Sequence, residues 1–279
     1  MSNSSSQSTK RKKVIIYGAI VVVILIVAGA FYKIHHQSHQ VLKIGITSSF
    51  AHQFEVAAEE AKKQGINVEI VEFSDWNTPN LTLEHGDIDV NYFQHQPFLT
   101  NAIKEGHLHL KPYAIGNVSN VGLYSKKYDR LDALPAHATI AIPNDPVNQG
   151  RALLLLQQGQ LIKLNPDAGY LAGLHDITDN PKQFKFVEVE GVQLARALSD
   201  VDLAFGYPHY LVVSKAFDPN KALLFDDIKN SNLYAIQFVV NDQFNDDGRL
   251  KKFVEIYRTS PVVKAALDHD FGKLYHPAW

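Results

Sequence analysis

The stretch Val41-Leu-Lys-Ile-Gly-Ile-Thr47 is rich in β-branched residues, and so is Asn67-Val-Glu-Ile-Val-Glu-Phe73 further along the chain. Both runs favour β-strands. Between them, apolar residues recur at helical spacing from Phe54 to Gln64, and Gly65 follows as a stop signal. Residues 41–73 are therefore predicted to form a strand, an amphipathic helix and a second strand.

The same alternation extends along the rest of the chain. Further strands are predicted at 88–93, 139–142 and 184–189, and further helices at 97–105, 148–158 and 192–198. Alternating strands and helices indicate an α/β protein with parallel sheets, in which ligands bind beyond the carboxyl ends of the strands. Two lobes fit the length best: lobe 1 from residues 41–122 plus about 237–279, and lobe 2 from 123–236.

The amino-acid composition excludes several kinds of function. The 279 residues are 46% hydrophobic and 20% charged, as in an ordinary soluble protein of one large or two average domains. The formal charge is −2, but residues 1–40 hold five basic and no acidic residues, which leaves −7 for the rest. Because residues 41–279 are net acidic, nucleic acid is an unfavourable partner for them. The absence of cysteine excludes disulfides, thiolate metal sites and any lipid carried on a thiol.

The N-terminal 40 residues predict a membrane anchor. Residues 1–13 form a basic, cytoplasmic tail, 14–32 form an uncharged stretch of nineteen residues, and 33–40 form a polar linker. Nineteen apolar residues can span a bilayer as a signal-anchor helix. We therefore expect a single-pass protein of the cell membrane whose binding domain is extracytoplasmic. Cleavage after Ala30, at a small-residue site, is the alternative.

Aromatic residues gather at the end of one predicted strand, in Asp89-Val-Asn-Tyr-Phe-Gln-His-Gln-Pro-Phe-Leu99. Tyr92, Phe93, His95 and Phe98 could line an apolar slot for a small side chain, and Trp76, which follows the preceding strand, could add a further face. Ordinary core aromatics and a surface histidine would explain the pattern equally well.

A carboxylate site is predicted at the start of the helix at 148–158. Asp145 suits the N-cap and Pro146 the first helical position, so Asn148 and Arg151 lie on one face near exposed backbone amides. The two parallel N–H groups of the Arg151 guanidinium could bind a carboxylate ligand there. The alternative interpretation is that Arg151 is an ordinary solvated arginine on a surface helix.

Enzymatic chemistry finds no support in the sequence. There is no nucleophile elbow, phosphate loop or His-Glu-x-x-His helix, and the thirteen histidines are scattered among different predicted elements. We expect no enzyme, no cofactor and no metal site. Asp226-Asp227 and Asp246-Asp247 are interpreted as solvated loops.

Three motifs resemble the methionine-binding lipoprotein (NlpA lipoprotein) family, which supplies substrate-binding proteins to ABC importers. They are Asp89-x-Asn-Tyr-Phe-Gln-His-Gln-Pro, Ile142-Pro-Asn-Asp-Pro-x-Asn-x-Gly-Arg-Ala-Leu-Leu-Leu-Leu-Gln157, and Glu188-Val-Glu-x-x-Gln-Leu-x-Arg-Ala-Leu198. The resemblance covers residues 41–279 and implies a two-lobed, type II periplasmic-binding-protein-like fold that closes by hinge motion. Its partners would be an amino-acid-like ligand and an importer permease.

The resemblance also implies roles for single residues. The ligand's thioether would lie among Trp76, Phe93, His95 and Phe98, and its carboxylate would meet Asn148 and Arg151. The family usually has tyrosine where this chain has Trp76 and Phe98. Tyr207, His209 and Ala235 stand where the family has asparagines that contact the amino-acid head group, so Tyr207 and His209 are candidate ligand residues.

The leading hypothesis is an extracytoplasmic solute-binding protein for methionine, a related amino acid or a short peptide. A surface receptor that kept the fold without transport is one alternative, and a metal-binding protein using His95 and His209 is another. The family is tethered through a lipidated cysteine, and Ala30 occupies that position here. We therefore expect the chain to be anchored by residues 14–32 and not by a lipid on cysteine.

Overall fold

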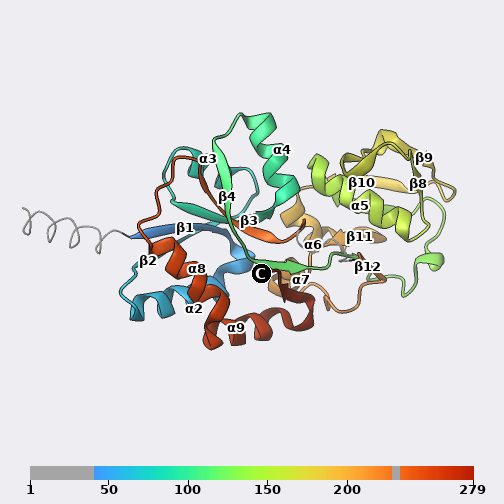
Figure 1. Ribbon diagram of the computed structural model, residues 1–279. Coiled ribbons are helices and arrows are strands. Elements are labelled where there is room, and N and C mark those ends of the chain that lie inside the picture. Colours follow the sequence, from blue (N-terminus) through green and yellow to red (C-terminus); the bar gives the residue numbers. More distant parts are fainter. Residues whose placement is uncertain (1–40, 228–232) are drawn as a thin grey trace, which may run out of the picture.

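The computed structural model describes residues 41–227 and 233–279, which form two lobes, each built on a five-stranded sheet (Figure 1). The predicted signal-anchor helix at 14–32 lies outside the described residues. Within the described ranges, no helix has both the length and the apolar character needed to cross a membrane.

Lobe 1 is built on the sheet order β2-β1-β3-β13-β4. Its strands are β1 (Leu42–Thr47), β2 (Val68–Phe73), β3 (Val90–His95), β4 (Leu110–Ile115) and β13 (Ile236–Asn241). β1 pairs in parallel with β2 and β3, whereas β13 runs antiparallel to both β3 and β4. The chain therefore returns from lobe 2 to complete the first sheet.

Lobe 2 repeats this arrangement in the order β10-β7-β11-β6-β12. Its strands are β6 (Gly122–Tyr124), β7 (Thr139–Pro143), β10 (Lys185–Val189), β11 (Leu203–Gly206) and β12 (Leu224–Phe225). β7 pairs in parallel with β10 and β11, and β6 is antiparallel to β11 and β12. The α/β class and the parallel pairs are confirmed, and each sheet also contains an antiparallel strand that was not predicted, β13 in lobe 1 and β6 in lobe 2.

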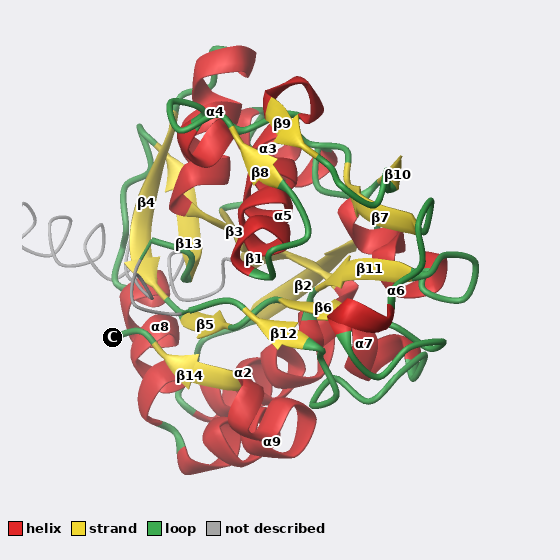
Figure 2. Cartoon of the chain, turned by 90° about the vertical axis from the view of Figure 1, so that its right-hand side faces the viewer, coloured by secondary structure: helices red, strands yellow, loops and turns green. Residues whose placement is uncertain are grey.

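Helices cover both faces of each sheet. In lobe 1, α2 (Ala51–Lys63), α8 (Arg249–Thr259) and α9 (Pro261–Phe271) pack together on one side, and α3 (Thr78–Glu84) and α4 (Gln96–Gly106) lie on the other (Figure 1). In lobe 2 the helices are α5 (Pro146–Gln158), α6 (Leu194–Ala197) and α7 (Pro208–Ser214). Figure 2 shows α5 facing α4 across the boundary between the lobes, and the two helices are in contact.

The remaining elements are short. Two-stranded ladders join β5 (Asn117–Ser119) to β14 (Tyr275–Pro277) and β8 (Lys163–Leu164) to β9 (Ile177–Asp179). The 3-10 turns are η1 (Ser48–Phe50), η2 (Leu131–Ala133), η3 (Gly169–Leu171), η4 (Leu174–Asp176), η5 (Gly191–Gln193) and η7 (Gly272–Leu274).

The chain passes from lobe 1 to lobe 2 at 116–121 and is back in lobe 1 at Ile236, and described residues before and after this return are hydrogen-bonded to the first crossing. The amide of Asp226 donates to the carbonyl of Val121 over 3.0 Å, and the Val121 amide donates to the Asp226 carboxylate over 2.9 Å. At the start of the first crossing, the amide of Gly116 donates to the carbonyl of Ile236 over 2.8 Å. Glycine is required there, because a Cβ atom would lie 2.4 Å from the ring of Tyr92.

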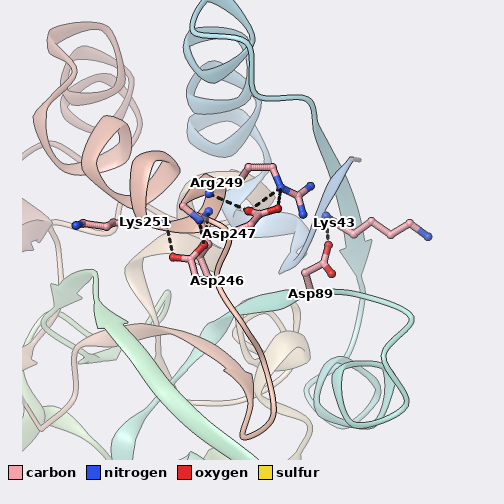
Figure 3. Close-up of polar contacts among 8 residues, drawn as sticks. Lys43, Asp89, Asp246, Asp247, Arg249 and Lys251 are labelled. Carbon is pink, nitrogen blue, oxygen red and sulfur yellow. Dashed lines mark hydrogen bonds and ion pairs between the residues drawn. The ribbon is translucent and has the colours of Figure 1, made fainter. Parts of the chain in front are cut away.

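The acidic pair Asp246-Asp247 has a structural role. Asp246 accepts the amides of Gly248 and Lys251, at 2.9 and 3.1 Å, and so satisfies free amides at the start of α8 (Figure 3). Asp247 accepts the Nε of Arg249 at 2.8 Å. The pair does lie in a loop, and Asp247 is exposed as expected, but both carboxylates also bond to their own chain.

Candidate functional site

A cavity of about 30 Å³ lies between the two lobes. That volume holds about one water molecule, so a larger ligand would enter only when the lobes move apart. Its lining consists of Trp76, Phe93, Gln94, His95, Phe98, Ser119, Asn148, Arg151, Tyr207, His209, Tyr234 and Ile236. Eight of the nine ligand-binding residues predicted from the sequence are among them, and Tyr92 is the exception.

Tyr92 belongs to the core of lobe 1. Its side chain is fully buried against Phe54 and Phe238, and its hydroxyl accepts the amide of Asn117 at 3.0 Å. Phe93 follows it on β3, and successive residues of a strand point to opposite faces of the sheet. The prediction of Tyr92 as a ligand residue is therefore wrong: it supports the first crossing between the lobes.

An aromatic wall closes one side of the cavity. The ring of Trp76 meets Phe98 edge-on at 6.1 Å and Tyr207 edge-on at 5.4 Å, and Phe93 meets Phe98 at 5.8 Å. Trp76 Nε1 donates to the hydroxyl of Tyr210 over 2.7 Å. Trp76 comes from lobe 1 and both tyrosines from lobe 2, so this wall joins the lobes.

The space for the Trp76 ring depends on a glycine in lobe 2. A Cβ atom on Gly191, the first residue of η5, would lie 1.9 Å from the indole. Gly191 therefore leaves room for the large indole of Trp76.

A polar chain crosses the cleft from His95 to Asp145. The Phe98 amide donates to His95 Nδ1 over 3.3 Å, so the ring proton lies on Nε2, which donates to Asn148 Oδ1 over 3.1 Å. Asn148 in turn donates to Asp145, which caps α5 as predicted. Burial and the charge of Arg151 lower the pKa of His95 to about 3, so the imidazole is neutral.

Arg151 is buried and already paired within the chain. Its Nη2 and Nε donate to Asp226 over 2.6 and 3.2 Å, and its guanidinium lies 4.0 Å from the ring centre of Tyr234. Two of its five N–H groups are used in these bonds, so others remain for a carboxylate in the cavity. The interpretation of Asp226 as part of a solvated loop is wrong, because its carboxylate fixes this arginine.

Tyr207 and His209 also line the cavity, and each is 6% exposed. Neither the Tyr207 hydroxyl nor His209 Nδ1 has a hydrogen-bond partner. Burial raises the pKa of Tyr207 well above its usual value, and burial together with the charge of Arg151 lowers the pKa of His209 to about 3. Both side chains are therefore uncharged at neutral pH.

Four lining residues were not predicted from the sequence. Gln94 lies inside the quoted strand motif, where Asn80 and Asn91 hold its amide, and Tyr234 lies in the segment that replaces a family asparagine motif. Ser119 comes from the first crossing between the lobes and Ile236 is the first residue of β13, and no local pattern marks either as a cavity residue. Ala235 is fully buried outside the lining.

The residues present do not favour a metal in the cavity. Both ring nitrogens of His95 are already engaged, so a metal would have to displace Asn148 or the Phe98 amide. In the part of the chain that the structure describes, one group of side chains could hold an ion by spacing alone: His52, His269 and Asp270, on α2 and α9.

Known proteins resemble this chain in sequence and in fold. The chain is 40% identical over 230 residues to the D-methionine-binding lipoprotein MetQ of Escherichia coli (strain K12), which covers 81% of this chain and 84% of that protein. A solved nutrient binding protein from Burkholderia cenocepacia, bound to methionine, has a TM-score of 0.80 and 35% identity, and covers 85% of this chain and 100% of its own. A crystal structure of the methionine binding protein MetQ has a TM-score of 0.80 and 36% identity, and covers 86% of this chain and 98% of its own.

The names of these relatives correct the predicted localisation. The similar proteins are named lipoproteins, whereas the sequence predicted a single-pass membrane protein without a lipid. The prediction of single-pass, unlipidated anchoring is therefore contradicted.

The family model described as NlpA lipoprotein matches residues 42–279, from the first residue of β1 to the end of the chain. The match covers both lobes and every residue that lines the cavity. The chain therefore belongs to the NlpA lipoprotein family.

Proposed function

We propose that the protein is the substrate-binding component of an ABC importer and binds methionine or a closely related amino acid between its lobes. The observation that carries this proposal is the pairing, in one interlobe cavity, of an aromatic wall with the buried arginine Arg151. A thioether or other unbranched apolar side chain suits the aromatic wall, and a carboxylate suits the free N–H groups of Arg151.

The names of the relatives support the same ligand class. One is a D-methionine-binding lipoprotein and one solved structure contains methionine. A substrate-binding protein of this kind would have an importer permease as its partner, and it would deliver the ligand to the permease when the lobes open.

We also propose that the protein performs no chemistry. The polar groups of the cavity are two neutral histidines, the amides of Asn148 and Gln94, an arginine paired with Asp226, the indole N–H of Trp76, and the hydroxyls of Ser119, Tyr207 and Tyr234. These groups fix and orient a ligand by hydrogen bonds and present no activated nucleophile.

Titration calorimetry with L-methionine, D-methionine, leucine and glutamine tests the proposal. The variant Arg151→Lys keeps the positive charge beside Asp226 but loses the planar fork, and we expect it to weaken methionine binding roughly 10- to 100-fold. Arg130→Lys, which changes an exposed arginine of the same lobe, is the matched control and should bind as the wild type does.

Three outcomes would contradict the proposal. They are equal affinities for methionine and glutamine, wild-type affinity in Arg151→Lys, and no binding of any amino acid to the folded protein.

A further inference from the structure

Two histidines and an aspartate meet on the surface of lobe 1, where the start of α2 reaches the end of α9. His52 is the second residue of α2, and His269 and Asp270 lie in the last turn of α9. One ligand atom from each of the three side chains lies within 4.8 Å of the other two. None of the three residues lines the interlobe cavity, so this cluster is separate from the proposed amino-acid site.

Asp270 holds both imidazole rings. Its Oδ2 lies 2.7 Å from Nδ1 of His52, and its Oδ1 lies 2.9 Å from Nδ1 of His269. The two rings are inclined by 73°, with their centres 6.2 Å apart. One carboxylate therefore brings two nitrogen ligands together from two different helices.

The helices that carry the cluster are fixed by packing. Phe54 and Ala57 of α2 lie in the same buried hydrophobic cluster as Leu267 and Phe271 of α9, and the two helices are in contact. Because the backbones are already held together, an ion at the cluster would have to order only three side chains. Such preorganisation lowers the entropy lost on binding.

The cluster is open to ions from solvent. The side chains of His52 and His269 are 54% and 82% exposed, whereas that of Asp270 is only 15% exposed. Zinc sites have metal–ligand distances of about 2.0–2.2 Å, so the three ligand atoms would have to draw closer, which rotation of the two exposed rings allows. Water can fill the remaining coordination positions.

The donor atoms decide which class of metal fits. Two imidazole nitrogens and one carboxylate oxygen suit zinc, nickel or copper. Calcium and magnesium prefer oxygen ligands alone. The plain alternative is that Asp270 accepts hydrogen bonds from two surface histidines and has no further role, and this alternative predicts no selective binding of a transition metal.

We propose that His52, His269 and Asp270 form a surface site for a divalent transition metal, with zinc as the probe, and that the bound ion clamps α2 to α9. The sequence predicted no metal site because its histidines are scattered among different predicted elements. The fold instead brings together residues that are 218 positions apart. This proposal goes beyond the proposed function and does not depend on the ligand of the interlobe cavity.

Zinc titration of the full chain, after removal of bound metal with EDTA, tests the proposal. Calorimetry measures the number of zinc ions bound and their affinity, and thermal unfolding shows whether bound zinc stabilises the fold. His35, His36 and His39 could also bind zinc, so the test compares variants of the chain with one another and not the wild type alone.

Two variants each remove one ligand. His52→Gln keeps an N–H donor for Asp270 but is a poor zinc ligand, and His269→Ala removes the more exposed imidazole. His109→Ala is the matched control. His109, in the same lobe, is 67% exposed and lies 2.8 Å from Glu84, but in the described ranges it belongs to no group of three possible ligands.

We expect zinc to raise the unfolding temperature of the wild type and of His109→Ala equally, because the ion binds the folded state. Loss of an outer-shell partner alone typically weakens metal binding roughly 10- to 100-fold. His52→Gln and His269→Ala, which lose a direct ligand, should therefore bind this zinc ion at least about tenfold more weakly and lose most of the rise in unfolding temperature. Magnesium at the same concentration should give no rise.

Three results would overturn the proposal. They are an unchanged unfolding temperature of the wild type with zinc, an equal response of the wild type and both ligand variants, and stabilisation by magnesium as large as that by zinc. None of them bears on methionine binding, so the proposed function would stand.

Discussion

Arg151 serves the fold and the cavity with different parts of one guanidinium. Its Nε and Nη2 hold Asp226, and the Tyr234 ring covers its face, so the group reaches the cavity already oriented. A donor that is fixed before the ligand arrives loses less conformational entropy on binding. This arrangement explains why a charged side chain that is only 7% exposed can be retained between two lobes.

The two cavity histidines predict a dependence of stability on pH. The pKa values of His95 and His209 are about 3 in the folded protein, whereas an unfolded histidine has a pKa near 6.5. Below that pH the unfolded chain takes up protons that the folded chain does not, so the free energy of unfolding falls between about pH 6.5 and 3. Each histidine contributes at most about 1.4 kcal/mol per pH unit.

Denaturant unfolding of the wild type and His209→Phe between pH 7.5 and 4.5 measures this effect. The variant should lose stability less steeply below pH 6.5, because one proton-linked group has been removed. The control His175→Phe removes a side chain that is 85% exposed and should parallel the wild type. Parallel curves for the wild type and His209→Phe would contradict the account of a buried, neutral His209.

At the scale of elements, most local structure could be predicted from the sequence. The helix predicted at 148–158 is α5, and Asp145 caps it through a bond from the Asn148 amide at 2.9 Å. The strand predicted at 88–93 is β3, shifted to 90–95. Periodicity and caps are local signals, so they identified these elements and the residues at their ends.

Pairings across long sequence separations could not be predicted. Arg151 and Asp226 are 75 residues apart, and no pattern around Asp226 distinguishes it from a solvated loop. The position of β13 between β3 and β4 could not be predicted either, because the chain reaches it only after passing through lobe 2. Tyr92 was misassigned because a strand gives alternate residues to opposite faces, and the sequence did not show which face met the cavity.

Asp226 also holds the first crossing between the lobes. Its carboxylate holds Arg151 and the Val121 amide, and its carbonyl accepts the Asn120 side chain at 2.8 Å. Asp226→Asn would leave Arg151 buried without its counter-charge. We expect the free energy of unfolding to fall by roughly 2–4 kcal/mol and amide exchange to accelerate at 117–122.

The control for this prediction is Asp132→Asn. Asp132 pairs with Arg130 on the surface, where both side chains are about 70% exposed, and its loss should cost less than about 1 kcal/mol. Equal effects of the two substitutions, measured by denaturant unfolding and hydrogen exchange, would show that Asp226 does not stabilise the first crossing.

At the scale of the whole molecule, the two sheets share no strand, and contacts across the cleft hold the lobes together. The Trp76 to Tyr210 bond, the His95 to Asn148 bond and the stacking of Phe50 on His209 all link lobe 1 to lobe 2. Opening the lobes would break these contacts and expose the cavity, which is the motion that capture and release of a ligand require.

A crystal structure of the protein grown with saturating L-methionine would test the proposed site most directly. We expect methionine in the interlobe cavity, with its thioether side chain against Trp76 and Phe98 and its carboxylate within hydrogen-bond distance of Arg151. Density for water alone in the cavity, or methionine bound elsewhere on the protein, would contradict it.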